Sequence, residues 1–236
     1  MKQFVSIQNE TIRRTARFLV GVCISAVGVA FASKSGLGTT PLSLPAYVLS
    51  QVFPLSIGEF LILQHSAFLL AQAILLRRAF RLSSLLQLPL AIVYEKATDL
   101  ALWCMDGFSA DIYAVRLLLC GVGIVVTGCG VCLMVKAKVL VLAGEGLTLA
   151  IAQRTGHEFG NVKIAVDCGL VLFSAMLSFS LLGRITGIRE GTVASAVLVG
   201  MVVRVLQAIS SHRAPARARH LLRGCKTTLL STSARD

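Results

Sequence analysis

Long apolar stretches alternate with short polar connections along most of the chain, and six of them are long enough to cross a bilayer. A hydrocarbon core about 30 Å thick takes about 20 apolar residues per helical crossing. The six stretches cover residues 18 to 35, 58 to 76, 83 to 104, 116 to 136, 162 to 182 and 190 to 209. The pattern predicts an all-α fold, a polytopic bundle of about six transmembrane helices.

Two further apolar segments are too short or too interrupted to cross. Residues 39 to 53 contain two prolines, and residues 139 to 153 contain Gly144 and Gly146. Irregular backbone at membrane depth is tolerated only where protein or a wet cavity surrounds it. We therefore expect two short broken helices that dip into the membrane.

Composition agrees with a membrane protein. Of the 236 residues, 56% are hydrophobic and only 14% are charged, and the mean hydropathy is +0.80. This balance is far from that of a soluble domain. We divide the chain into a cytoplasmic N-terminal segment (1 to 17), a single transmembrane domain (18 to 209) and a basic cytoplasmic tail (210 to 236).

Basic residues lie mainly at the ends of the apolar stretches. The formal net charge of +12 would suggest nucleic acid binding in a soluble domain, but here it follows the positive-inside rule and attracts anionic lipid. With six crossings, one face receives the tail and three groups: Arg13, Arg14 and Arg17; Arg77, Arg78 and Arg81; Lys136 and Lys138. We expect both termini in the cytoplasm and the lipid bilayer, not nucleic acid, as a partner. Arg184 and Arg189 fall on the other side and oppose this assignment.

A shift of 102 residues aligns the two halves of the sequence. The stretch VGVCISAVGVAFASK, which begins at residue 20, then matches VGIVVTGCGVCLMVK, with Gly21 on Gly123 and Gly28 on Gly130. We place the repeats at about 18 to 105 and 116 to 209. Each would hold three crossings, and an odd number inverts the second copy relative to the first. Inverted repeats in transporters place a binding site near the bilayer midplane, between the halves.

Glu145 stands at the predicted break of the second short segment, between Gly144 and Gly146, and matches Ser43 in the first repeat. Glycine lets a ligand approach bare backbone amides. Alternatively, the glycines form a simple turn and Glu145 faces water at the interface.

Ionisable residues inside the apolar stretches are the other candidates, because such groups persist in a membrane where they have a partner, a wet cavity or a task. Lys163 and Asp167 share one helix face; they either neutralise each other, bind a charged solute or pass a proton. His65 matches Asp167 in the repeat, and either bonds a neighbouring helix or couples protons. The charged cluster at residues 95 to 99 lies near an outer end, where snorkelling lowers its cost.

Three motifs carry a resemblance to a known family. They are SGLGTTPLSLPAYVLS (35 to 50), GEGLTLAIAQRTGHEFGNVKIAVDCGLVL (144 to 172) and GIREGTVASAVLVG (187 to 200). From about residue 17 to about 207 the chain resembles the YczE-like (YczE/YyaS/YitT) integral membrane proteins of bacteria. The resemblance implies a small helical protein of the bacterial inner membrane, of a group usually described as permeases or regulatory membrane proteins. It points to Gly36, Gly38, Thr39, Pro41, Glu145, Lys163, Asp167, Glu190 and Thr192; the basic tail matches no part of the family pattern.

The sequence offers no constellation for catalysis. It has no nucleotide-binding loop, no His and Cys cluster with metal-ligand spacing, and no nucleophile set beside a base. Seven cysteines show no disulfide framework, and the pair Cys129 and Cys132 is interpreted as small packing residues. We expect no enzyme activity, no cofactor and no metal.

These features favour a small secondary transporter, or permease, that moves a small polar or charged solute by alternating access through a midplane site. The predicted binding residues are Glu145, Lys163, Asp167, Thr39, Thr40, Gly144, Gly146, Glu190 and Thr192, with Glu145 or His65 for proton coupling. The alternative is a regulatory membrane partner without transport activity. Small residues in the first and fourth stretches permit close helix contacts, either within one chain or between the two chains of a homodimer.

Overall fold

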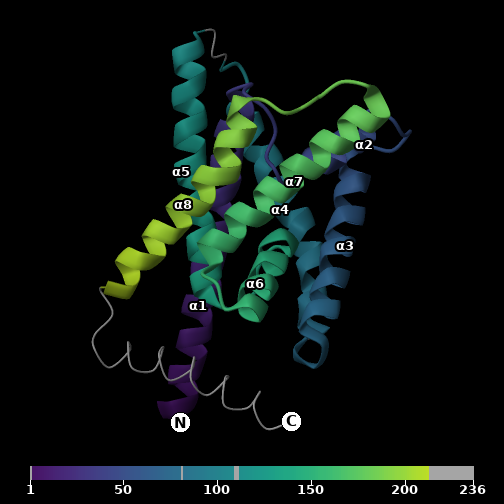
Figure 1. Cartoon of the computed structure of the whole chain (residues 1–236). Coiled ribbons are helices and arrows are strands. Elements are labelled where there is room, and N and C mark those ends of the chain that lie inside the picture. Colours follow the sequence, from purple (N-terminus) through teal and green to yellow (C-terminus); the bar gives the residue numbers. More distant parts are fainter. Residues whose placement is uncertain (1, 81, 109–111, 213–236) are drawn as a thin grey trace.

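The computed structural model describes residues 2 to 80, 82 to 108 and 112 to 212, and every regular element in these residues is a helix (Figure 1). The main helices are α1 (Lys2–Lys34), α2 (Leu44–Ser50), α3 (Ile57–Leu76), α4 (Gln87–Cys104), α5 (Tyr113–Ala137), α6 (Ala143–Thr155), α7 (Phe159–Leu182) and α8 (Glu190–His212). Two short 3-10 helices, η1 (Arg77–Ala79) and η2 (Leu82–Leu86), join α3 to α4. The predicted all-α class is confirmed. Arg81 and most of the basic tail, residues 213 to 236, lie outside the described residues.

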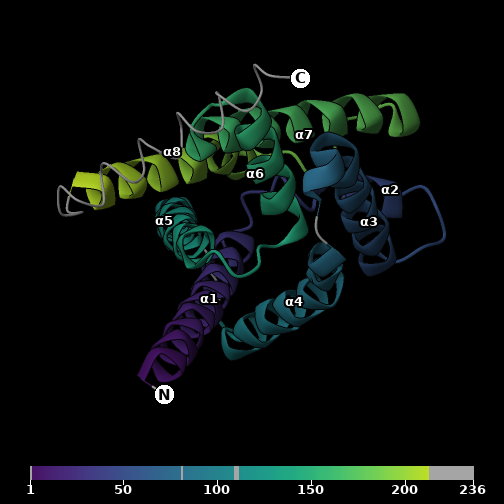
Figure 2. The same cartoon turned by 90° about the horizontal axis from the view of Figure 1, so that it is seen from below.

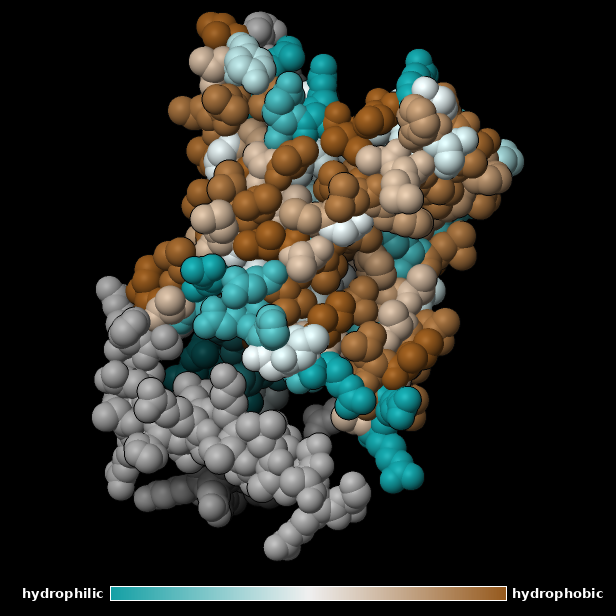
Figure 3. Space-filling model, viewed as in Figure 1, coloured by the Kyte–Doolittle hydropathy of each residue, from teal (hydrophilic) through white to brown (hydrophobic). Residues whose placement is uncertain are grey.

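Five helices are long and apolar enough to cross a membrane, as expected of a multi-pass membrane protein. They are Glu10–Lys34, Ile57–Ala79, Tyr113–Ala137, Phe159–Leu182 and Glu190–Ile209. Hydrophobic side chains cover the middle of the face shown in Figure 3, and polar ones gather toward its ends. Residues 83 to 104, expected as a sixth crossing, form η2 and α4 but are not among these five; the 18 residues of α4 include Glu95, Lys96 and Asp99.

Short helices occupy both of the interrupted segments. α2 has a proline in its first turn, where the missing N–H costs no hydrogen bond. α6 ends at Gly156, whose φ of +72° is the left-handed conformation typical of a helix end. The expectation that Gly144 and Gly146 break the segment is wrong, because both lie inside the first turn of α6, which begins at Ala143.

The antiparallel helices α1 and α5 pack backbone to backbone at the centre of the molecule. A Cβ added to Gly130 would lie 2.5 Å from the Ser25 nitrogen, and one added to Gly123 would lie 2.7 Å from the Gly28 carbonyl oxygen. Glycine is therefore required for this approach. The small residues predicted to mediate close helix contacts do so here within one chain.

Two helices pack directly on this pair. α4 packs on α1, and α8 packs on α5. Both short helices, α2 and α6, contact both α3 and α7. Figure 2 shows α6 between α7 and α3, toward the middle of the bundle, so its first turn is held inside the protein.

Candidate functional site

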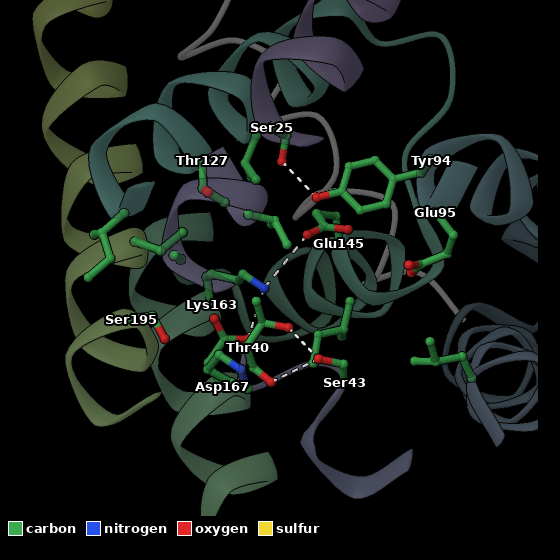
Figure 4. A pocket seen from close by; sticks show the side chains of 18 residues that line it. Ser25, Thr40, Ser43, Tyr94, Glu95, Thr127, Glu145, Lys163, Asp167 and Ser195 are labelled. Carbon is green, nitrogen blue, oxygen red and sulfur yellow. Dashed lines mark hydrogen bonds and ion pairs between the residues drawn. The ribbon is translucent and has the colours of Figure 1, made fainter. Parts of the chain in front are cut away.

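A cavity of about 110 Å³ lies among α1, α4, α5, α6, α7 and α8, and the segment before α2 closes one wall (Figure 4). It has room for several water molecules or a small solute. Its polar lining consists of Ser25, Thr40, Ser43, Tyr94, Glu95, Thr127, Glu145, Lys163, Asp167 and Ser195. The other lining residues are apolar.

A buried ionisable trio lies in this cavity. The Lys163 ammonium donates a hydrogen bond to Asp167 Oδ1 at 2.8 Å, and its Nζ lies 3.7 Å from Glu145 Oε1. The first two belong to α7, four residues apart on one face, and Glu145 comes from the first turn of α6. Glu145 is only 5% exposed, which does not fit the alternative in which it faces bulk water.

Two buried polar atoms near this trio lack a hydrogen-bond partner among the described residues: Glu145 Oε2 and His65 Nδ1. Buried polar atoms are paired in most proteins, so an unpaired one calls for an explanation such as a bound ligand. His65 lies on α3, does not line the cavity, and is close enough to the Glu145 carboxylate to interact with it electrostatically.

The glycines on either side of Glu145 let α6 fit tightly among its neighbours. A Cβ on Gly144 would lie 2.5 Å from Leu42 Cδ1. One on Gly146 would lie 2.7 Å from Gln72 Oε1 and 2.9 Å from Gln87 Oε1. The two glycines thus bring the first turn of α6 against α3, α4 and the segment before α2.

Gln72 and Gln87 form a reciprocal amide pair beside α6. Each Nε2 donates to the Oε1 of the other, at 3.1 and 3.2 Å, and Gln72 Nε2 also donates to the Ala143 carbonyl at 3.1 Å. Both glutamines, with Gly146 and Lys138, are among the residues that line a second pocket, the vestibule, of about 580 Å³. The pair therefore lies where the vestibule meets the turn that presents Glu145.

Two hydroxyl pairs shape the cavity wall. The Tyr94 hydroxyl lies 3.1 Å from Ser25 Oγ and so links α4 to α1. Thr40 Oγ1 lies 2.6 Å from Ser43 Oγ. Thr40, a predicted binding residue, and Ser43, the match of Glu145 in the first repeat, both line the cavity.

Other predicted binding residues lie outside the cavity lining. Thr39 and Thr192 each donate a hydrogen bond from Oγ1 to the Gly187 carbonyl, at 3.4 Å. Gly38 has a φ of +122°, and a Cβ there would collide with Thr192 Oγ1. Glu190 is exposed at the start of α8. Gly38, Thr39 and Thr192 thus connect the segment before α2 to the loop before α8, and Glu190 lies in solvent. None of them lines the cavity that holds the trio.

A model of a family of unknown function matches residues 12 to 208. The chain belongs to this family, DUF6198. No curated protein and no solved structure matches the chain significantly. The DUF6198 match includes every residue that lines the cavity, the vestibule and the amide pair.

Sequence analysis missed several polar residues that this DUF6198 protein places at the site. Tyr94 follows an apolar run and directly precedes the charged cluster, and Gln72 and Gln87 lie within predicted apolar crossings, so none of the three stands out in the sequence. One signal could have found Ser25 and Thr127: they match each other at the shift of 102 residues, and both line the cavity.

Proposed function

We propose that the protein is a small secondary transporter that binds a polar or charged solute in the central cavity and moves it by alternating access. The observation that carries this proposal is the ionisable trio of Glu145, Lys163 and Asp167, buried beside a polar cavity. Groups of this kind are costly at membrane depth and mark substrate or ion pathways. A protein that only scaffolds a partner has no need for an internal polar cavity.

Helix boundaries support the two inverted repeats. α3 begins at Ile57 and α7 at Phe159, which are 102 residues apart. α1 and α5 end at Lys34 and Ala137, and the short helices α2 and α6 follow each of them. The same order of long, short, long and long helices thus occurs twice, at the spacing of the sequence repeat.

The contacts between α1 and α5 also support an inverted arrangement. Gly21 packs on Gly130, and Gly28 packs on Gly123. Gly21 matches Gly123 in the repeat, and Gly28 matches Gly130. Exchanging the two repeats therefore converts one contact into the other. Reciprocal contacts of this kind are what a two-fold axis produces.

The halves differ in one respect that suits alternating access. α7 packs along α8, whereas the matching helices α3 and α4 touch at few positions. When two related halves adopt different arrangements, an exchange of these arrangements moves the opening to the central site from one side of the membrane to the other. The vestibule at Lys138 and the amide pair of Gln72 and Gln87 would form the access route and its gate on one side.

The proposal takes α4 as the sixth crossing. Its 18 residues span about 27 Å, close to the thickness of the hydrocarbon core, and Glu95 lines the cavity instead of lying wholly in lipid. Six crossings place both termini, with the basic clusters, in the cytoplasm. The family resemblance to YczE-like proteins adds the bacterial inner membrane as the location.

Flux measurements test the transport proposal. The full chain would be reconstituted in vesicles and assayed with a panel of labelled cationic, zwitterionic and anionic solutes of a few non-hydrogen atoms. We expect saturable flux of at least one class, abolished by Glu145→Gln. Glu158→Gln is the matched control, because Glu158 is exposed and makes no side-chain cap at the start of α7.

A complete lack of flux across the panel would overturn the transport proposal. If the protein then co-purified stoichiometrically with an enzyme, the regulatory alternative would replace it. Comparable flux in wild type and Glu145→Gln would refute the role of the trio.

A further inference from the structure

The central cavity is acidic, although the protein as a whole is strongly basic. Its lining holds three carboxylates, Glu95, Glu145 and Asp167, and one ammonium group, Lys163. The formal net charge of the chain is +12. The local charge in the cavity therefore has the opposite sign to that of the protein, and it attracts cations to the place where a solute would bind.

Lys163 neutralises only part of this charge. Its ammonium group makes a close hydrogen bond to Asp167 at 2.8 Å but stands 3.7 Å from the nearer oxygen of Glu145. The other oxygen, Oε2, has no partner in the described part of the chain. A buried carboxylate oxygen without a partner is costly, and a cation with a donor group would pair with it.

The neutral lining also suits a cation. The Tyr94 ring lies beside Glu145 (Figure 4), and an aromatic face attracts organic cations. The hydroxyl oxygens of Thr40 and Ser43 can accept hydrogen bonds from N–H groups. No second basic side chain lines the cavity within the described residues, so the lining offers little to hold an anion.

We propose that the transported solute is a small organic cation with N–H donors, which binds at the unpaired oxygen of Glu145. This inference rests on the proposed function and names its substrate class. The charged and titratable groups that face Glu145 are His65 from α3, Tyr94 and Glu95 from α4, and Lys163 and Asp167 from α7. The cavity-lining residues of α1 and α5 are uncharged. Because Lys163 makes its close hydrogen bond to Asp167, Glu145 Oε2 is the acceptor that remains for the cation.

Binding of a small N–H cation is the direct test. Radiolabelled guanidinium chloride at low millimolar concentration would be equilibrated by dialysis with the detergent-purified full chain. We expect saturable binding at a single site. Excess tetramethylammonium, which has no N–H donor, and sodium chloride at the same ionic strength should not displace it.

Variants assign the effect to Glu145. Glu145→Gln should weaken guanidinium binding roughly 10- to 100-fold, as expected for loss of a hydrogen bond to a charged group. Glu158→Gln should behave as wild type. Circular dichroism and size-exclusion elution show whether each variant is folded, and a folded Glu145→Gln that binds guanidinium as tightly as the wild type would overturn the proposal.

The outcomes separate this inference from the transport proposal. If glycine or acetate is carried by vesicles and guanidinium does not bind, the solute class is wrong while transport stands. If guanidinium binds at Glu145 but no solute crosses the vesicle membrane, the cation site stands and transport is wrong.

Discussion

Replacing Gly130 with alanine should force apart the central pair of helices. A Cβ at this position of α5 would lie 2.5 Å from the Ser25 nitrogen and 2.7 Å from the Gly21 carbonyl oxygen, both on α1. Ordinary van der Waals contact begins near 3.4 Å, so α1 and α5 must separate by about 0.9 Å. The nearest atoms are all backbone, and no side-chain rotation can relieve the contact.

The size of the effect follows from this geometry. Overpacking of a well-packed interior costs about 1 to 3 kcal/mol, and the better helix propensity of alanine offsets up to about 1 kcal/mol. For a chain of this size, each kcal/mol lowers the melting temperature by about 2 to 4 °C. We therefore expect Gly130→Ala to melt roughly 2 to 10 °C below the wild type. Gly121→Ala is the matched control, because Gly121 lies on the same helix, is exposed and has no atom within 4 Å of an added Cβ.

Thermal unfolding of the purified chain in detergent, followed with a thiol-reactive dye, measures the difference. Cys120 and Cys132 are buried in the folded protein and become reactive on unfolding. Gly28→Ala, at the matching position of the first repeat, should lower the melting temperature as Gly130→Ala does. If Gly130→Ala melted at or above Gly121→Ala, the close packing of α1 on α5 would be refuted.

Three further predictions concern other parts of the fold. Lys163→Met leaves two buried carboxylates without their cation and should destabilise the protein by about 3 to 5 kcal/mol. The same thermal assay measures the change, and a destabilisation below about 1 kcal/mol would contradict the buried trio. Gln87→Leu leaves part of the Gln72 amide without a hydrogen-bond partner and should lower the free energy of unfolding by about 1 to 3 kcal/mol. The double variant with Gln72→Leu should recover some of this loss, whereas additive losses would argue against the amide pair. Ser56→Ala removes the capping box at the start of α3 and should cost about 1 kcal/mol; no change in melting would show that the cap contributes nothing.

The long helices could be predicted from the sequence because apolar runs of about 20 residues leave little alternative in a membrane protein. The predicted positions of the helix ends were less accurate. The crossing expected from residue 83 begins as a helix only at Gln87, since Leu82–Leu86 form a 3-10 turn. The first crossing was expected from residue 18, but α1 already starts at Lys2, because helix formation does not require apolar residues outside the membrane.

The site was only partly predictable. Four-residue spacing was enough to pair Lys163 with Asp167, since i,i+4 neighbours share a helix face. The approach of Glu145 is a contact between helices, which local spacing does not contain. Gly144 was expected at a break in the helix, but it lies inside α6, where its missing side chain leaves room for Leu42. A glycine in a sequence is compatible with either a helix break or a close contact, so the sequence alone did not distinguish them. Glu190 was selected from a motif that resembles the YczE-like proteins, but it is exposed, because such a motif does not distinguish residues that pack from residues that bind.

Glycine placement also indicates which helices are free to move. Gly160 and Gly200 bring α7 and α8 into backbone contact, since a Cβ on either would lie 2.8 Å from the carbonyl oxygen of the other. The matching residues of the first repeat are Gly58, which has open space around it, and Thr98, whose side chain prevents an equally close approach of α3 to α4. The pairs α1–α5 and α7–α8 are therefore closely packed, and α4 also packs on α1, whereas α3 touches α4 at few positions besides the amide pair beside α6. Under the transport proposal we expect α3 to move against this closely packed part, with Glu145 on α6 at the boundary between the two.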